Sequence, residues 1–316
     1  MKTMIKKASY FIALLGLTAC EPFDFEQEMG QKVICIISDA DYVYTGMHDL
    51  NKLESTGYIS VNCGGSLHID RDVNVELEYA PVLLEQYNKL KYDIDEAKYA
   101  KELPAGHYTI PNLTVALKAD TPDTYNVMSI QVKPEGLSPD SVYLIPLRIK
   151  AVSCYSVNPD KCQVLYQVQM RNLYARTDEN TIYSATGTMQ KEGEAVIEAA
   201  ASQTFHPLTK NSFRIFAGIK AYEKNEAVIK QNGISVTVNE DNSLTMNPYD
   251  DEYIEVASID PARPDYYGNY ELANVYGGKK RQCFNFQYKY RFKGNSQWET
   301  VKLRSLRSVT LDLIND

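Results

Sequence analysis

Three pairs of aspartates are the first residues in this sequence whose type and spacing suit chemistry. Each pair has one residue between its members: Asp39 with Asp41, Asp70 with Asp72, and Asp93 with Asp95. Alternate residues of a strand share a face, so such a pair can present two carboxylates to Ca²⁺ or to a glycosidic bond. Pairs of this kind also arise by chance in an acidic chain, and none of these lies in a glycine-turned calcium loop. We therefore keep a glycosidase as the less favoured alternative and predict no metal site.

Other signatures of catalysis are absent from the sequence. The four histidines are scattered and never have the HExxH spacing of a zinc site: His48, His68, His107 and His206. There is no GxSxG nucleophile elbow and no glycine-rich phosphate loop. The sequence therefore predicts a protein that is not an enzyme and that uses no cofactor.

A tyrosine-rich segment at residues 260–278 is the best candidate for a binding site. The chain has 24 Tyr, one Trp and nine Phe. Aromatic faces stack on sugar rings, and Pro261 and Pro264 stiffen the segment, which lowers the entropy cost of binding a glycan. The candidate glycan-binding residues are Tyr266, Tyr267, Tyr270 and Tyr276, with Asp265 and Asn269 as hydrogen-bonding partners and Trp298 from a later turn.

Packing inside the protein is the competing interpretation for each of these aromatic residues, because tyrosine also suits half-buried strands. Adjacent residues of a strand point to opposite faces. Tyr266 and Tyr267 therefore cannot both enter one core, and we expect one of them to be exposed. A third and weaker candidate is the loop at residues 39–46, where Tyr42 and Tyr44 share a face.

Alternating hydrophobic residues between turn residues recur along almost the whole chain, which is typical of β-strands. The polar segment 175–180 lacks this periodicity and marks the predicted domain boundary. We predict an all-β protein, with an immunoglobulin-like β-sandwich over residues 31–176 and an antiparallel barrel or sandwich over residues 177–316. Short helices are expected within residues 81–103, and helix propensity predicts one helix at residues 191–203.

The first twenty residues resemble the signal of a bacterial lipoprotein. Three lysines precede an apolar run of 12 residues at positions 8–19, which is shorter than the roughly 20 residues of a membrane-spanning helix. Leu17-Thr18-Ala19-Cys20 looks like a lipobox, so we expect residues 1–19 to be removed and Cys20 to carry lipid. The alternative is an ordinary secretory signal that happens to contain a cysteine.

An acidic tether at residues 20–30 follows the predicted lipid site. It resembles the export tag of Bacteroidetes surface lipoproteins, which implies a place on the outer membrane facing the cell exterior. Loss of residues 1–19 removes three lysines and no acidic residue, so the net charge of −8 becomes −11. An acidic chain without a basic run suits neither nucleic acid nor anionic lipid. We predict contact with a membrane only through the lipid on Cys20.

Two further modifications are predicted from short motifs. Cys154 and Cys162 flank the turn Asn158-Pro159-Asp160, which places them at the mouth of one hairpin loop and predicts a disulfide. Five cysteines follow Cys20, and an odd number leaves at least one thiol free or in an intermolecular bond. Asp140-Ser141-Val142 resembles the Bacteroidetes O-glycosylation acceptor, which makes Ser141 a candidate for modification.

Three motifs resemble a family of Bacteroidetes surface lipoproteins from glycan-utilisation loci: Tyr87-Asn88, Leu103-Pro104 with Tyr108, and Tyr143 with Pro146-Leu147. In that family they belong to an N-terminal β-sandwich that also occurs ahead of endo-β-N-acetylglucosaminidase domains. The second half resembles the barrel-like domain that often follows. The resemblance covers about residues 30–310, and it carries over no binding residue. The run of alternating acids of the catalytic domain in some relatives is missing here.

These observations favour a non-catalytic, lipid-anchored protein of the outer-membrane surface that binds glycan for a polysaccharide-utilisation system. Its expected partners are a polysaccharide or glycoprotein glycan and an outer-membrane importer complex, with no nucleic acid. The main alternative is an adhesin or pilus-like structural subunit that pairs strands with another chain. A glycosidase that uses one of the aspartate pairs is the third hypothesis.

Overall fold

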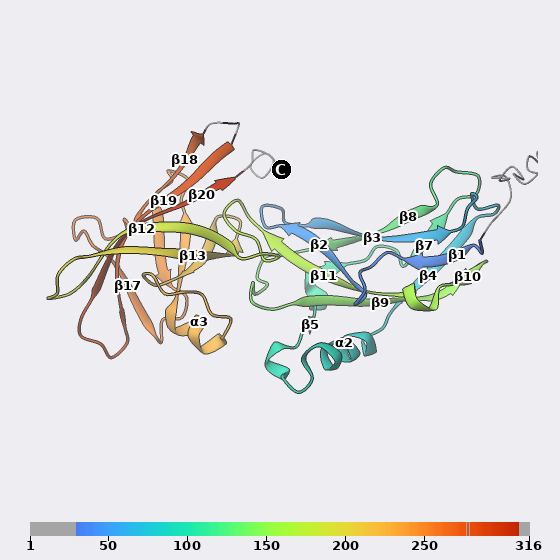
Figure 1. The fold of residues 1–316 in the computed structure, drawn as a ribbon, viewed down its shortest axis with the longest axis horizontal. Coiled ribbons are helices and arrows are strands. Elements are labelled where there is room, and N and C mark those ends of the chain that lie inside the picture. Colours follow the sequence, from blue (N-terminus) through green and yellow to red (C-terminus); the bar gives the residue numbers. More distant parts are fainter. Residues whose placement is uncertain (1–29, 276, 278, 310–316) are drawn as a thin grey trace, which may run out of the picture.

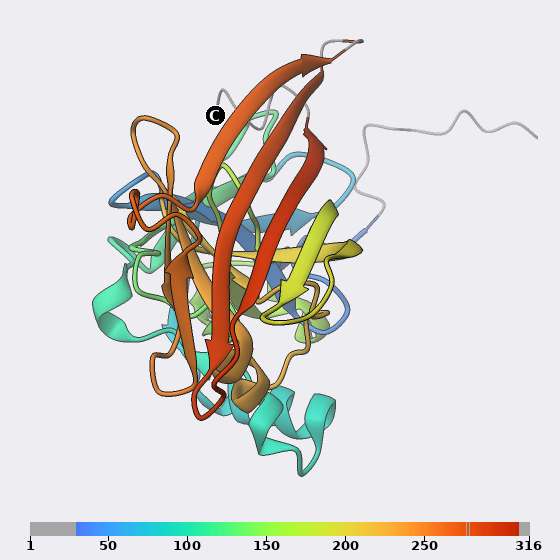
Figure 2. The same cartoon turned by 90° about the vertical axis from the view of Figure 1, so that its left-hand side faces the viewer.

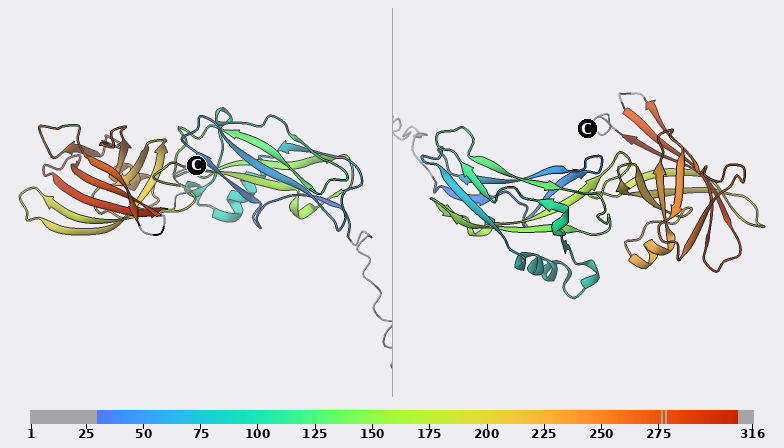
Figure 3. Two further views of the ribbon diagram at one scale, coloured as in Figure 1. Left: turned by 90° about the horizontal axis from the view of Figure 1, so that it is seen from above. Right: turned by 180° about the vertical axis from the view of Figure 1, so that it is seen from behind.

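The protein is elongated, with two β-rich domains lying end to end along its long axis (Figure 1). The computed structural model describes residues 30–275, 277 and 279–309. The predicted signal, nearly all of the acidic tether with the lipidation site Cys20, and the candidate Tyr276 lie outside the described residues. Views from above and from behind show the same end-to-end arrangement (Figure 3).

The first domain is a sandwich of two β-sheets, so the predicted fold class is confirmed for this half. One sheet contains β10 (Ser156–Val157), β1 (Val33–Ile36), β3 (Ser55–Gly64), β8 (Tyr125–Val132) and β6 (Tyr108–Thr109), in this order. The other contains β2 (Val43–Asp49), β11 (Gln163–Arg171), β9 (Tyr143–Val152), β4 (Val73–Tyr79) and β7 (Thr114–Leu117), with β5 (Lys101–Glu102) beside β9. Most pairs are antiparallel, but β1–β10, β2–β11 and β5–β9 are parallel.

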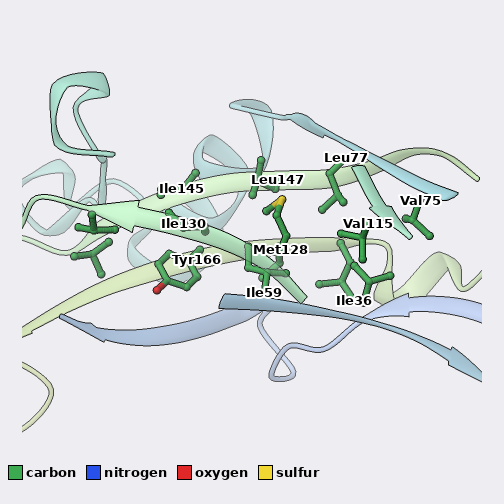
Figure 4. Packing of buried hydrophobic residues seen from close by; sticks show 14 of the residues in the cluster. Ile36, Ile59, Val75, Leu77, Val115, Met128, Ile130, Ile145, Leu147 and Tyr166 are labelled. Atoms are coloured by element: carbon green, nitrogen blue, oxygen red, sulfur yellow. The ribbon is translucent and has the colours of Figure 1, made fainter. Parts of the chain in front are cut away.

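The core of this domain is built from alternate residues of facing strands. In β3 every second residue is buried, as expected for a strand with one face on a core. Ile59 of β3 and Met128 and Ile130 of β8 lie opposite Ile145 and Leu147 of β9 (Figure 4). Burying such side chains contributes about 1.5–3 kcal/mol each to folding, so this layer holds the two sheets together.

A buried tyrosine in the same core depends on two glycines. The hydroxyl of Tyr166 lies 2.9 Å from Nε2 of His48, and a Cβ added at Gly46 or Gly57 would overlap that hydroxyl. We expect Gly57→Ala to lower the free energy of unfolding by about 1–3 kcal/mol, because the core would be overpacked. Urea unfolding of this variant beside Gly106→Ala, where a Cβ meets open space, checks the prediction. Equal unfolding midpoints for the two variants would contradict it.

Helix α2 (Val82–Tyr92) lies along the outside of the second sheet, beside β9 (Figure 1). Leu83 and Tyr87 are buried against this sheet. The side chain of Asn88 accepts from the N–H of Ala100 at 2.8 Å and donates to its carbonyl at 2.9 Å. The Tyr-Asn motif therefore has a physical role: tyrosine fixes the helix to the sheet, and asparagine fixes the returning chain to the helix.

The second domain is one strongly curled antiparallel sheet that nearly closes into a barrel (Figure 2). Its two end strands, β16 and β17, approach each other. The order is β16 (Leu244–Pro248), β15 (Gly233–Val238), β14 (Ser212–Phe216), β13 (Ile197–Thr209), β12 (Thr181–Lys191), β20 (Glu299–Val309), β19 (Lys279–Phe292) and β17 (Ile254–Ser258), with β18 (Gly268–Val275) also paired to β19.

Aromatic side chains fill the interior of this curled sheet. The rings of Phe205 and Phe213 stack with their centres 4.4 Å apart, and Tyr183 stacks on Phe205 at 3.9 Å. Phe284 meets Phe213 edge-on at 4.9 Å. Pairs of this kind contribute about 0.5–1.5 kcal/mol beyond the area that they bury, so these rings account for much of the packing of the second domain.

The short helices expected within residues 81–103 are confirmed by α2 and a 3₁₀ turn, but the helix predictions for the second domain failed. The helix expected at residues 191–203 is wrong, because most of that segment belongs to β13, which pairs along its length with β12. Helix propensity is local, and pairing with a neighbouring strand overrides it. The helix α3 (Glu226–Asn232) was not expected, although Asn225 caps it by accepting from the N–H groups of Ala227 and Val228. Short 3₁₀ turns η1 (Glu96–Lys98), η2 (Ala105–His107) and η3 (Pro159–Lys161) complete the chain.

The disulfide predicted between Cys154 and Cys162 is not formed, and both are free thiols in the structure. The carbonyl of Cys162 accepts from the N–H of Ile149 at 2.8 Å, whereas Cys154 follows the end of β9. The thiol of Cys162 approaches the carbonyl of Pro159 at 3.3 Å, and that of Cys154 approaches Asp72 at 3.8 Å. The two cysteines therefore do not face each other across the mouth of a hairpin.

A buried ion pair joins the two domains. Asp140, from the segment before β9, accepts two hydrogen bonds of 2.6 Å from the guanidinium of Arg214 in β14. Arg214 is fully buried, and its guanidinium carbon lies 4.8 Å from the ring centre of Tyr249. The hydroxyl of Tyr222 also donates to Asp140, at 3.3 Å. A bidentate pair of this kind fixes orientation as well as distance, so it sets the angle at which the domains meet.

The segment that links the domains is held by one asparagine. The side-chain amide of Asn172 donates to the carbonyls of Thr209 and Ser212 in the second domain, at 2.7 and 2.8 Å. Its side-chain oxygen accepts from the N–H groups of Tyr174 and Ala175. All the hydrogen-bonding groups of this buried amide are therefore used, which makes the linker a fixed part of the structure.

Candidate functional site

The loop between β17 and β18 contains the predicted candidate residues and is organised by one hydroxyl. Ser258 Oγ lies 2.9 Å from the carbonyl oxygens of both Arg263 and Tyr266. The guanidinium carbon of Arg263 is 3.7 Å from the ring centre of Tyr266, so part of this ring is covered by its own loop. Asp265 is exposed. The loop thus has a defined shape and offers a half-buried aromatic ring beside a free-standing carboxylate.

The neighbouring candidates belong to the sheet rather than to this loop. Tyr270 is buried, with its ring centre 4.8 Å from that of Phe284, so it is a core residue and not an exposed binding residue. Tyr267 is half-buried and packs against the same core. Asn269 lies on the outer face, where it donates to Glu271 at 2.9 Å. One of Tyr266 and Tyr267 was expected to be exposed, but both are half-buried, because they lie in the loop before β18 and not on a strand with two opposite faces.

Trp298 lies apart from the tyrosine loop. The guanidinium carbon of Arg291 lies 4.7 Å from the centre of the Trp298 ring, and the ammonium nitrogen of Lys289 lies 5.1 Å from it. Arg291 pairs with Glu255 near the start of β17, whereas the loop of Tyr266 leaves the end of that strand. The six predicted residues that the structure describes therefore do not converge on one site.

In each aspartate pair at least one carboxylate forms an ion pair: Asp41 with Lys91 in the first pair, both aspartates in the second, and Asp95 in the third. Asp70 pairs with Arg71 at 3.1 Å, Asp72 with Lys118 at 2.6 Å, and Asp95 with Lys98 at 2.7 Å. Hydrogen bonding to Lys118 holds the pKa of Asp72 below its usual value. In the described parts of the chain, no group of three or more His, Cys, Asp or Glu residues is placed to hold a metal ion.

A pocket of about 390 Å³ in the first domain is better formed than any of the predicted sites. It lies between α2, the loop before β2 and the start of β11; we call it the α2 pocket. Its volume falls in the range of about 300–1,000 Å³ that is typical of small-molecule sites. Leu83, Leu90 and Leu165 give it an apolar wall, and its polar or aromatic lining residues are Asp41, Tyr42, Gln86, Tyr87, Lys91 and Gln163.

The backbone at Tyr42 has an unusual conformation that places this residue at the pocket. Its φ of 63° lies in the left-handed region, which bulky residues rarely adopt. The strained turn is held by hydrogen bonds from Tyr42 N–H to the carbonyl of Asp39 at 3.2 Å and from Leu165 N–H to the carbonyl of Tyr42 at 2.8 Å. Backbone strain that the surroundings hold in place is common at binding sites.

Lys91, Tyr87 and Asp41 form the polar end of the α2 pocket. The ammonium of Lys91 donates to the hydroxyl of Tyr87 at 2.7 Å and lies 3.7 Å from a carboxylate oxygen of Asp41. The hydrogen bond to Tyr87 raises the pKa of Lys91, so the ammonium is charged at neutral pH. The side chains of Lys91 and Asp41 are 46% and 50% exposed, so a ligand can reach both.

The chemistry of the α2 pocket suits a hydroxyl-rich ring. Gln86 and Gln163 carry amides that both donate and accept, Lys91 donates, and Asp41 accepts. Aromatic rings beside a few converging polar groups bind a molecule that has an apolar face and polar edges. Asp41 is the single carboxylate among the described lining residues, whereas glycoside hydrolysis needs two.

The sequence pattern predicted Tyr42 as part of a weaker candidate loop and indicated no binding role for Tyr87, whose side chain is largely buried. One available signal was the spacing within α2, because Gln86 and Leu90, like Tyr87 and Lys91, are four residues apart and share one side of a helix. The contribution of Gln163 had no such signal, since only the sheet brings β11 beside the loop before β2.

Models of two protein domains match the chain in succession. A family model for an N-terminal domain matches residues 31–156, and the companion model for a C-terminal domain matches residues 162–305. Together the two models cover most of the chain, one as an N-terminal and the other as a C-terminal domain. The resemblance expected from the Tyr-Asn and Tyr-x-x-Pro-Leu motifs is thereby confirmed. No curated protein matches the chain.

Solved structures share the two-domain architecture over almost their full lengths. A protein of unknown function from Bacteroides ovatus is 17% identical, with a TM-score of 0.67 over 89% of this chain and 96% of that one. Another from the same organism is 14% identical, with a TM-score of 0.63 over 93% and 96%. An auxiliary nutrient binding protein from Bacteroides thetaiotaomicron is 13% identical, with a TM-score of 0.57 over 87% and 94%. At such identities these likenesses establish the fold.

Proposed function

We propose that this protein is a non-catalytic, lipid-anchored protein of the outer-membrane surface that binds glycan for a polysaccharide-utilisation system. The observation that carries the binding role is the α2 pocket, with two tyrosines and converging polar groups in a volume suited to a small ligand. The name of one structural relative, an auxiliary nutrient binding protein, agrees with this role. The pairing of the aspartates with cations favours binding over catalysis.

The proposed location depends on the N-terminal sequence. The lipobox ending at Cys20 and the acidic residues that follow it support an anchor on the outer membrane, facing the cell exterior. Among the described residues, no helix has the length and apolar character needed to cross a membrane. An outer-membrane importer complex is the proposed receiver of the bound glycan. O-glycosylation of Ser141 stays a prediction; this residue is half-buried, and its hydroxyl accepts from Lys101 at 3.2 Å.

Replacing Tyr42 is expected to weaken binding of the glycan on the order of 30-fold, the effect of losing an aromatic contact at the centre of a site. Tyr42→Asn is the suitable variant, because asparagine tolerates the left-handed backbone. Residues 21–316 are first screened by affinity electrophoresis in native gels containing mannan, arabinoxylan, dextran or polygalacturonate. Isothermal titration with the polysaccharide that retards the protein then gives the dissociation constants.

The matched control is Tyr253→Ala, which removes a 43% exposed tyrosine from the second domain and is expected to leave binding unchanged. Tyr266→Ala and Trp298→Ala test the sites predicted from the sequence. If binding survives Tyr42→Asn and is lost in one of these two, the site lies in the second domain. A folded wild-type protein that no polysaccharide retards would be evidence against the glycan-binding role itself.

A further inference from the structure

A second surface of the first domain carries aromatic side chains and no charge. It consists of the outward-facing alternate residues of two paired strands, from Thr56 to Asn62 in β3 and from Tyr125 to Gln131 in β8. We call it the outer strip. Three of its side chains are well exposed: Tyr58 at 51%, Tyr125 at 54% and Val127 at 42%. The inward-facing residues of the same strands, such as Ile59 and Ile130, form the core.

The register of the two strands fixes the positions of the aromatic rings. Tyr58 lies opposite Ser129, and Tyr125 lies opposite Asn62. Along the strand direction, Tyr58 and Tyr125 are therefore separated by four residues, or about 14 Å. The two strands that carry them lie about 5 Å apart. Ser60 and Val127 form the pair between them. The outer strip thus presents two separated rings with hydroxyl and amide groups around them, which is the pattern that an extended chain of sugar rings would contact.

The absence of charge indicates what kind of ligand fits. Charged residues make up about 25–35% of a typical soluble surface, and 23% of this chain. The eight positions of the outer strip, all described by the structure, contain only Thr, Tyr, Ser, Asn, Val and Gln. A surface without charges does not attract an acidic polymer. Binding of a neutral ligand to it also avoids the cost of removing water from a charged group. Its chemistry is complementary to an uncharged, hydroxyl-rich ligand.

The outer strip is connected to the α2 pocket by a short loop. Ile37, which is 43% exposed, borders the strip, because its N–H donates to the carbonyl of Ser60 at 3.0 Å. Five residues later the chain reaches Tyr42 of the pocket, so the Cα atoms of Ile37 and Tyr42 are at most about 18 Å apart. The strip and the pocket lie on opposite outer faces of the sandwich, so a polymer that contacts both must pass around the edge where this loop runs (Figure 1).

We infer that the outer strip is a second binding surface for an extended, uncharged polysaccharide, with Tyr58 and Tyr125 as stacking platforms. This inference rests on the proposed function and names its ligand class. A polymer that occupies both the strip and the α2 pocket binds with greater avidity than either contact gives alone, because the second contact forms within one complex. A short oligosaccharide occupies the pocket without reaching the strip. Because the strip carries no charges, added salt should change little of the affinity that the strip contributes to polymer binding.

The test compares polymer with oligomer in the chain from residue 21. The double variant Tyr58→Ala, Tyr125→Ala is expected to bind mannan, arabinoxylan or dextran, whichever retards the wild type, at least tenfold more weakly. Its affinity for the tetrasaccharide of that same polymer should be unchanged. Tyr58→Phe with Tyr125→Phe keeps both ring faces and should keep most of the affinity for polymer. Circular dichroism and the unfolding temperature confirm that each variant is folded.

The outcomes separate the two proposals. If the alanine pair loses affinity for polymer while Tyr42→Asn retains it, the outer strip is supported and the α2 pocket is not. If the alanine pair binds polymer like the wild type, the strip is not a glycan surface. A wild-type dimer that the alanine pair converts to monomer on light scattering, with polymer binding unchanged, would assign the strip to contact between copies of the chain. Retardation by polygalacturonate alone would overturn the uncharged ligand class.

Discussion

Replacing Asp140 by alanine is expected to lower the free energy of unfolding by about 3–5 kcal/mol, because the guanidinium of Arg214 would stay buried without its partner. Arg214 has no exposed surface, and both of its bonds to Asp140 are 2.6 Å long. Burial alone would raise the pKa of Asp140. The hydrogen bonds and charge of Arg214 outweigh burial and leave that pKa below its ordinary value, so the carboxylate is ionised at neutral pH.

Urea unfolding at pH 7.5 measures this loss, and small-angle scattering shows whether the domains keep their end-to-end arrangement. The double variant Asp140→Leu, Arg214→Met should recover much of the stability, since removing both charges avoids the cost of burying one alone. Asp95→Ala breaks an exposed pair with Lys98 and serves as the control with little effect. If Asp140→Ala unfolded at the same urea concentration as this control, the ion pair would not hold the domains together.

Acid is expected to destabilise the folded protein through two buried histidines. Burial lowers the pKa of His48 from 6.5 to about 4. Burial, followed by the charge of Arg214, lowers the pKa of His206 to about 4 as well. In the unfolded chain both would bind protons near pH 6.5, so unfolding takes up protons between pH 6.5 and 4. Stability therefore falls as the pH falls through this window, and neither residue contributes to pH dependence above it.

The expected loss is of the order of 3 kcal/mol for each histidine once the pH reaches 4, from a pKa difference of about 2.5 units. Urea unfolding midpoints at pH 7.5, 5.5 and 4 measure it. His206→Gln should remove about half of the pH dependence, and His68→Gln, at an exposed position, should remove none of it. A pH dependence that survives replacement of both His48 and His206 would show that other groups are responsible.

Local patterns predicted much of the fold, because many of the strands carry their own period-two alternation. The segment predicted as a strand at residues 58–63 lies in β3, and the alternation at residues 283–292 lies in β19. The prediction failed where long-range pairing decided the outcome. The segment 191–203 has good helix formers, yet its residues 197–203 are in β13 and pair with β12. Likewise, the turn at Asn158-Pro159 was recognised, but the register that separates Cys154 from Cys162 was not.

The candidate site could be predicted only in part, for the same reason. Tyr42 was noted because of its neighbours in sequence, but its partners in the α2 pocket lie at Tyr87 and Gln163. Composition marked the tyrosines as a class and could not show which ring is covered. Tyr270 is enclosed by Phe284, whereas Tyr58 and Tyr125 stand on an outer face that only the pairing of β3 with β8 creates.

The order of the two domains has a mechanical consequence for a protein held by its N-terminal end. The proposed anchor, the α2 pocket and the outer strip all adjoin or belong to the first domain. Tension between a bound polymer and the membrane would enter at β1, which is hydrogen-bonded on both sides, to β3 and to β10. It would then pass through the sandwich without crossing the junction of Asp140 and Arg214. The second domain would feel none of this pull, so its orientation would stay constant while the first domain holds a taut polymer.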